Sequence, residues 1–206
     1  MSEGDFFGEQ AKRETAASVK DVEACTSAEL VVAVRPRSGR YGVLAYHFGL
    51  GVAVLVVAFL LLSPEVYSVE AIAIDGILAF AIGTLLATSF DTILRLLSRT
   101  STIDRNLHDA SRAAFFDLGI SRTSGRNGIL VYVSLFERRC VMLADLGIDP
   151  AALEPGWSAA KGELERAVKQ RQLAGFQQAL RSLGPVLGKA HPRSTDDVNE
   201  LPDEVQ

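Results

Sequence analysis

The chain of 206 residues is 48% hydrophobic and 22% charged, and its formal net charge at pH 7 is −4. A net negative charge gives nucleic-acid binding no electrostatic support, because that binding depends on cations that neutralise phosphates. The sequence contains no nucleotide-binding loop, no serine-hydrolase elbow and no zinc-protease motif. The two cysteines, Cys25 and Cys140, lack the spacing of a metal site or redox pair, and we expect both to be small core residues.

The N-terminal part predicts one helix followed by one strand. Residues 9–24 place apolar side chains such as Val19 and Val22 on one helical face and charged side chains on the other. Residues 28–34 form a short apolar run rich in β-branched side chains, which is typical of a buried strand. The first 22 residues are of mixed charge and lack a continuous apolar segment, so we expect no cleavable signal peptide.

Residues 43–62 and 71–90 form two nearly uninterrupted apolar stretches. Each has about 20 residues, the length that an α-helix needs to cross the hydrocarbon core of a bilayer. The alternative is a pair of buried helices in a soluble protein, but such helices usually keep a polar stripe, which residues 52–62 lack. The connection is short and contains Pro64, so the sequence predicts an antiparallel transmembrane hairpin.

Arginines flank this hairpin on both sides, whereas its connection, residues 63–70, has no lysine or arginine. They are Arg35, Arg37 and Arg40 before the hairpin and Arg95, Arg99 and Arg105 after it. The positive-inside rule therefore places both termini and the soluble part in the cytoplasm. We expect a two-span protein of a bacterial inner membrane, whose partners are the lipid bilayer and other membrane proteins.

Small residues recur at every fourth position of both apolar stretches. They are Ala45, Gly49 and Ala53 in the first and Ala79, Gly83 and Ala87 in the second. Such stripes let helix backbones approach closely in lipid, and an antiparallel pair would set Gly49 opposite Gly83. The alternative is chance, because alanine and glycine are common in such helices.

After the hairpin the sequence predicts further helices and strands. Asp104 is expected to cap a helix that runs to Leu118 and is ended by Gly119. Two strands and then two helices are expected at 129–135, 140–143, 156–170 and 173–188. We therefore predict an α/β fold, a single small α/β sandwich domain interrupted after its first strand by the transmembrane helical hairpin.

This interpretation divides the chain into four segments. The 42 residues before the hairpin are too few for a domain of their own, so they are assigned to the same domain as the residues after it. The segments are 1–42 (first part of the domain), 43–90 (hairpin), 91–191 (second part of the domain) and 192–206 (acidic extended tail). The tail is interpreted either as a partner-docking segment or as a solvated end.

Four separated blocks of the sequence carry a family likeness. They read TSAELVVAV at 26–34, RNGILVYVS at 126–134, ERR at 137–139 leading into LADLGID at 143–149, and DVNELPD at 197–203. Together they resemble the TPM domain and the tail of its bacterial membrane-associated members. The resemblance implies an α/β sandwich domain, usually attached to a membrane, in a family named partly for an acid phosphatase of chloroplast thylakoids. It also implies calcium binding through aspartates in some relatives.

The present chain departs from the commonest plan of that family. In that plan a secreted or lumenal domain follows a signal peptide and precedes a C-terminal anchor. Here the hairpin follows the first predicted strand, and the arginines place the domain inside the cell. The external role of secreted relatives is therefore not expected of this chain.

The candidate site is the pair Asp145 and Asp149, which lies on either side of Gly147 just after the third predicted strand. Loops at strand ends gather ligands in α/β proteins, and carboxylate oxygens are preferred ligands of calcium and magnesium. A site of this kind would need backbone carbonyls, waters or another acid as well. Glu137 is the nearest acid in sequence, but it lies across a strand connection.

A second interpretation assigns these aspartates structural roles. Asp145 would hydrogen-bond its own turn, and Asp149 with Pro150 would begin the next helix. Two function hypotheses therefore stay open. One is a binding or assembly module at the cytoplasmic face of the membrane that binds a divalent cation, calcium or magnesium. The other is a metal-dependent phosphatase that uses Asp145 and Asp149, with Arg122 and Arg126 supplying positive charge for the phosphate.

Overall fold

The computed structural model describes residues 8–193, 199–201 and 205. The predicted tail at 192–206 and the sequence block at 197–203 therefore lie partly outside the described residues. The chain forms two compact units. One, called here the α/β unit, comprises residues 1–38 and 105–206, and the other, the helical unit, comprises residues 39–104.

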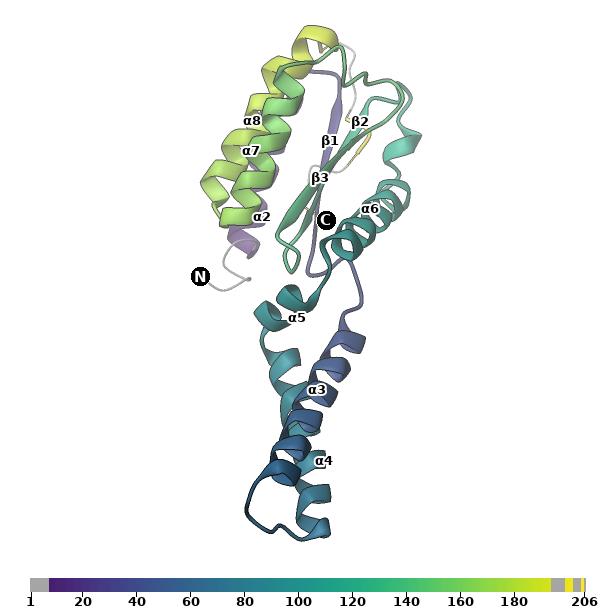
Figure 1. Ribbon diagram of the computed structural model, residues 1–206. Helices are drawn as coiled ribbons and strands as arrows, with labels where there is room; N and C mark the ends of the chain where they lie inside the picture. Colours follow the sequence, from purple (N-terminus) through teal and green to yellow (C-terminus); the bar gives the residue numbers. More distant parts are fainter. Residues whose placement is uncertain (1–7, 194–198, 202–204, 206) are drawn as a thin grey trace. The chain divides into compact units, whose positions relative to one another are not determined.

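The α/β unit is built on a three-stranded sheet in the described part of the chain. Its strands are β1 (Glu29–Arg35), β2 (Gly128–Ser134) and β3 (Arg139–Ala144). The order is β1-β2-β3, with β1 parallel to β2 and β3 antiparallel to β2 (Figure 1). Every residue of β2 is buried, as expected for an apolar central strand covered on both faces. The three predicted strands are confirmed to within one residue at each end.

Helices cover both faces of this sheet. One face packs against α2 (Glu9–Glu23), α7 (Gly156–Gln170) and α8 (Leu173–Ala190), and the other against α6 (Thr100–Asp117), as Figure 1 shows. Successive strand residues point to opposite faces, so Val32 joins the first core and Val31 joins the second. The mixed α/β fold is therefore confirmed, and so are the helices predicted at 9–24 and 156–170.

Two sequence predictions in these elements are wrong. Asp104 does not cap α6, because that helix begins one turn earlier, at Thr100, after an extended backbone at Ser98. Cys25 is exposed rather than buried, because it lies just beyond the end of α2, where its thiol reaches the carbonyl of Asp21. Cys140 is buried in β3 as expected, and burial raises the pKa of its thiol.

The helical unit contains α3 (Gly42–Leu62), α4 (Val69–Ser89) and the short helix α5 (Asp91–Leu97). Both α3 and α4 have 21 residues and are long and apolar enough to cross a membrane. Only 11% and 17% of their apolar windows are buried, which is not the pattern of core helices in a soluble protein. Their bounds agree with the predicted stretches to within two residues.

Small residues form the contact between α3 and α4. Ala45 and Gly49 are the buried residues of α3, and Ala79, Gly83 and Ala87 are those of α4. A Cβ atom added to Gly83 would lie 3.0 Å from the Cα of Gly49. One added to Gly49 would lie 2.7 Å from the carbonyl oxygen of Phe80. The predicted meeting of Gly49 and Gly83 is confirmed, whereas Ala53 is only half-buried.

Candidate functional site

Polar side chains gather at both ends of the sheet in the α/β unit. One end carries the first residues of β1 and β2 and the last residue of β3, because β3 runs antiparallel to the other two. Asp145 follows β3 at this end. Glu137 lies in the β2–β3 turn at the other end. The two acids are thus separated by the length of β3, and Glu137 does not join the candidate metal pair.

Asp145 is held by Arg126 through two hydrogen bonds. Nε of Arg126 donates to Oδ2 of Asp145 at 2.7 Å, and Nη2 donates to Oδ1 at 2.9 Å. Oδ1 also accepts the backbone N–H of Leu146 at 2.8 Å. The carboxylate side chain is only 4% exposed, and its hydrogen bonds raise the pKa of Arg126. Such bidentate pairs are among the stronger hydrogen bonds in proteins, so this carboxylate is already engaged by a cation of its own chain.

Gly147 brings the Asp145 loop against the turn that contains Arg126. Its N–H donates to the carbonyl of Arg126 at 2.8 Å. A Cβ atom at this position would lie 2.5 Å from the carbonyl oxygen of Gly125 and 2.6 Å from that of Arg126. Only glycine fits so close to two backbone carbonyls. The loop of residues 144–149 and the turn of residues 123–127 are therefore packed directly against each other.

Asp149 has a different role from Asp145. It is exposed, and its Oδ1 accepts the N–H of Ala151 at 3.0 Å, which begins a series of turns through residue 155. The expectation that Asp149 and Pro150 begin a helix is wrong, because α7 begins at Gly156. Among the described residues, no group of three or more histidine, cysteine, aspartate or glutamate side chains is arranged to hold a metal ion.

Glu137 is a buried acid with a bonding role that the sequence did not reveal. Its side chain accepts the N–H of Ser38 at 2.8 Å and the hydroxyl hydrogen of Ser134. Ser38 in turn lies 3.2 Å from the hydroxyl of Tyr132, whose pKa is raised by burial. Beside them the guanidinium of Arg37 lies 4.9 Å above the ring of Phe136. These contacts hold the segment that follows β1 against the β2–β3 turn.

A third polar cluster joins the segment at residues 199–201 to the sheet end that carries Asp145. The carboxylate of Glu200 accepts the hydroxyl of Ser124 at 2.5 Å and its N–H at 3.0 Å. These hydrogen bonds lower the pKa of Glu200. The carboxylate of Glu29 accepts the N–H of Glu200 at 3.3 Å and that of Leu201 at 3.4 Å. The sequence left the tail open between a docking segment and a solvated end, and it did not reveal these contacts with Ser124 and Glu29.

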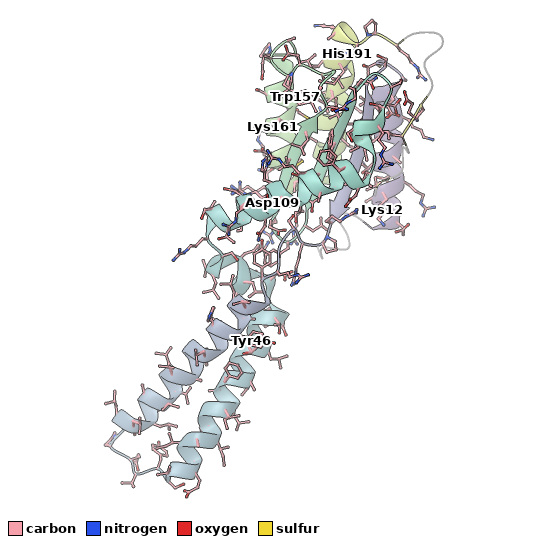
Figure 2. The ribbon with its side chains drawn as sticks, turned by 90° about the vertical axis from the view of Figure 1, so that its right-hand side faces the viewer. Lys12, Tyr46, Asp109, Trp157, Lys161 and His191 are labelled. Carbon is pink, nitrogen blue, oxygen red and sulfur yellow. The ribbon has the colours of Figure 1, made fainter. Side chains whose placement is uncertain are left out.

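The start of β1 is also tied to the end of α8. Thr26 donates its hydroxyl to the carbonyl of His191 at 2.7 Å, and the N–H of Ser27 donates to the same oxygen at 3.0 Å. Figure 2 labels His191 at the end of α8. A small pocket of about 190 Å³ lies beside this connection, lined by Lys20, Glu23, Thr26, Ala28, Glu29, Arg193 and Asn199. Its lining mixes both signs of charge.

Comparisons with known proteins bear on the fold alone. No protein-family model matches the chain, and no curated protein matches it either. Among solved structures, the chain is similar to the NMR structure of the BA42 protein from the psychrophilic bacterium Bizionia argentinensis. The TM-score is 0.58 at 17% sequence identity, and the match covers 97% of this chain and 94% of that chain. The likeness supports the mixed α/β fold.

Proposed function

We propose that this chain is a TPM-like binding or assembly module, held at the cytoplasmic face of a bacterial inner membrane by α3 and α4. In this proposal α3 and α4 form a membrane anchor that is inserted in the sequence after the first strand of the domain. The α/β unit binds other proteins of the same membrane. The observation that carries the proposal is the exposed apolar surface of α3 and α4.

Large apolar side chains are exposed along both helices. Leu55, Phe59 and Leu62 of α3 are 72%, 68% and 86% exposed. Ile77 and Leu85 of α4 are 69% and 65% exposed, and Figure 2 shows Tyr46 at the surface of α3. Burying an apolar side chain of this size in a nonaqueous environment gains about 1.5–3 kcal/mol. So large an exposed apolar surface is expected in lipid rather than in water.

The helix pairing is of a kind that suits lipid. Lipid provides no hydrophobic force between helices, so pairing depends on close backbone packing, which Gly49 and Gly83 permit. Toward the α3–α4 connection the pair leaves an apolar groove of about 760 Å³, lined by residues such as Leu50, Val57 and Phe80. Acyl chains of the bilayer would fill such a groove.

The contacts of Asp145 favour the binding module over the phosphatase. A metal-dependent phosphatase using Asp145 and Asp149 would need both carboxylates on one ion. Asp145 instead engages Arg126, and Asp149 engages the N–H of Ala151. Calcium or magnesium binding at this pair would have to displace the guanidinium of Arg126.

Thiol labelling in intact cells tests the anchor and its orientation. Cys25 is exposed and Cys140 is buried, so a membrane-impermeant maleimide will report on Cys25 in the unmodified chain. We expect Cys25 to react only after the membrane is permeabilised. A Cys25→Ser chain carrying Glu65→Cys, in the α3–α4 connection, is expected to react without permeabilisation. Reaction of Cys25 in intact cells would reject the proposed orientation, and release of the chain by alkaline carbonate would reject the anchor.

A further inference from the structure

The segment at residues 199–201 is held in place mainly by side chains that lie far away in the sequence. Glu29 opens strand β1, and Ser124 lies in the turn before β2. The segment itself belongs to no helix or strand. Its position is therefore set by the contacts that its backbone and side chains make with the α/β unit. The name 199–201 site is used here for Glu29, Ser124 and the apolar cluster between the sheet and α6.

The first recognised group is the carboxylate of Glu200. Ser124 donates both its hydroxyl and its backbone N–H to this one carboxylate, at 2.5 and 3.0 Å. Hydrogen bonds to an ionised acceptor are stronger than those between neutral groups. The turn around Ser124 is itself fixed by the Arg126 contacts with Asp145 and Gly147. The two donors are therefore positioned before any carboxylate arrives.

The second recognised group is the peptide backbone. The carboxylate of Glu29 accepts the N–H of Glu200 at 3.3 Å, and it shares the N–H of Leu201, at 3.4 Å, with Oδ1 of Asn199, at 3.1 Å. Glu29 is only 5% exposed although it is an acid at the edge of the sheet. A charged residue is rarely buried unless its oxygens are bonded, and here the segment supplies part of that bonding.

The third recognised group is the side chain of Leu201. It packs against the apolar cluster between the sheet and α6, which contains Val31, Leu130 and Phe115. The site thus contacts three kinds of group in the segment. Ser124 binds an acidic side chain, Glu29 binds backbone N–H groups, and the cluster between the sheet and α6 packs against an apolar side chain. This is how short peptides are recognised by folded domains, with main-chain bonds for affinity and side-chain contacts for specificity.

We propose that the 199–201 site is a recognition site for a short acidic and apolar peptide, and that the 199–201 segment of a second copy of this chain binds it in trans. The site of one copy would meet the same three groups in the segment of another copy, because both copies carry the same residues. Anchoring two copies in one membrane raises their effective concentration. The inference rests on the proposed function, since it names a partner for the binding module.

The chain's own segment competes with the trans partner, so the test removes that competition. In one full-length variant, Ser124→Asp places a carboxylate against Glu200 and disables the site, while the segment stays native. In the other, Glu200→Ala with Leu201→Ser disables the segment, while the site stays native. The two are purified in detergent with different affinity tags, mixed, and captured through one tag. Glu163→Ala, the same kind of change at an exposed position of α7, serves as the control.

We expect the mixture of the two variants to co-capture at least about tenfold more partner than either variant mixed with itself. Only the mixture contains an open site and a free native segment. The Glu163→Ala control should behave like the unmodified chain. Equal capture in all three mixtures, with both variants folded by circular dichroism, would overturn the inference. Thiol labelling of the same variants reports on the membrane anchor separately, so failure of one proposal is distinguishable from failure of the other.

Discussion

The guanidinium of Arg126 donates a hydrogen bond to each carboxylate oxygen of Asp145, with N–O distances of 2.7 and 2.9 Å. For Asp145 the sequence left two roles open, a metal ligand and a structural contact in its own turn. Asp145 thus serves to join two loops, the 144–149 loop and the 123–127 turn. The turn in turn carries Ser124, which contacts Glu200. One ion pair therefore supports both the strand end and the docked segment.

This pairing predicts the response of the chain to divalent cations. A cation that binds the folded state with a Kd one hundredfold below its concentration would add about 2.7 kcal/mol to the free energy of unfolding. Because Arg126 occupies Asp145, we expect millimolar calcium or magnesium to leave the unfolding temperature unchanged. The fluorescence of Trp157, the single tryptophan, reports on the α/β unit that buries it (Figure 2). A rise of several degrees that disappears in Asp145→Asn and Asp149→Asn would instead establish the metal site.

Two glycine substitutions should change stability in opposite directions. Gly147→Ala puts a Cβ atom 2.5 Å from a backbone carbonyl, and we expect it to lower the free energy of unfolding by about 2 kcal/mol or more. Gly162→Ala lies in α7 with no atom within 4 Å of the added Cβ, and we expect it to raise that free energy by up to about 1 kcal/mol. Urea unfolding followed by Trp157 fluorescence measures both. Equal effects of the two changes would contradict the close approach at Gly147.

The helix pair offers a similarly matched test. Leucine at Gly49 or Gly83 would force α3 and α4 apart, and we expect each change to destabilise the pair by about 1–3 kcal/mol. Gly51→Leu is the control, because a Cβ atom at Gly51 meets nothing within 4 Å. Thermal loss of helical circular dichroism in detergent measures the effect. If Gly49→Leu and Gly51→Leu lose helix at the same temperature, the small-residue contact does not hold the pair.

Docking of the 199–201 segment should depend on pH. Its hydrogen bonds with Ser124 lower the pKa of Glu200 from the ordinary value of 4.5. A group whose pKa is lowered on docking stabilises the docked state above its ordinary pKa, and that contribution is lost as the pH falls through the lowered value. We therefore expect protection of the Ser124 amide from hydrogen exchange to decrease below about pH 4.5. In Glu200→Gln the protection should be weaker at neutral pH and should not change across this range.

The sequence predicted most of the elements because their signals are local. Apolar runs such as 129–135 and the helical spacing of Val19 and Val22 depend only on neighbours along the chain. The same holds for Gly49 and Gly83, whose pairing follows from the antiparallel arrangement of two adjacent helices. The start of α6 was misplaced because Asp104 is a good helix cap by type, but the backbone breaks earlier, at Ser98.

The contacts of the site could not be read from the sequence. Asp145 and Arg126 are 19 residues apart, and Ser124 and Glu200 are 76 apart. The sequence contains many acids and many hydrogen-bond donors. Their pairing depends on strand register and on the loop geometry that Gly147 permits. The role of Asp145 was therefore open between a metal ligand and a loop contact until the position of Arg126 was known.

The parallel pairing of β1 with β2 sets an order of events during synthesis. Glu29 pairs with Gly128, about 100 residues later, and α3 and α4 are both made in between. Strand β1 thus leaves the ribosome long before its only neighbour in the described sheet exists. Pairing over so long a separation is slow, because a large loop must close before any contact forms. Because α3 and α4 lie between β1 and β2 in the sequence, both apolar helices are made before the sheet can assemble, and the α/β unit completes its fold only after them.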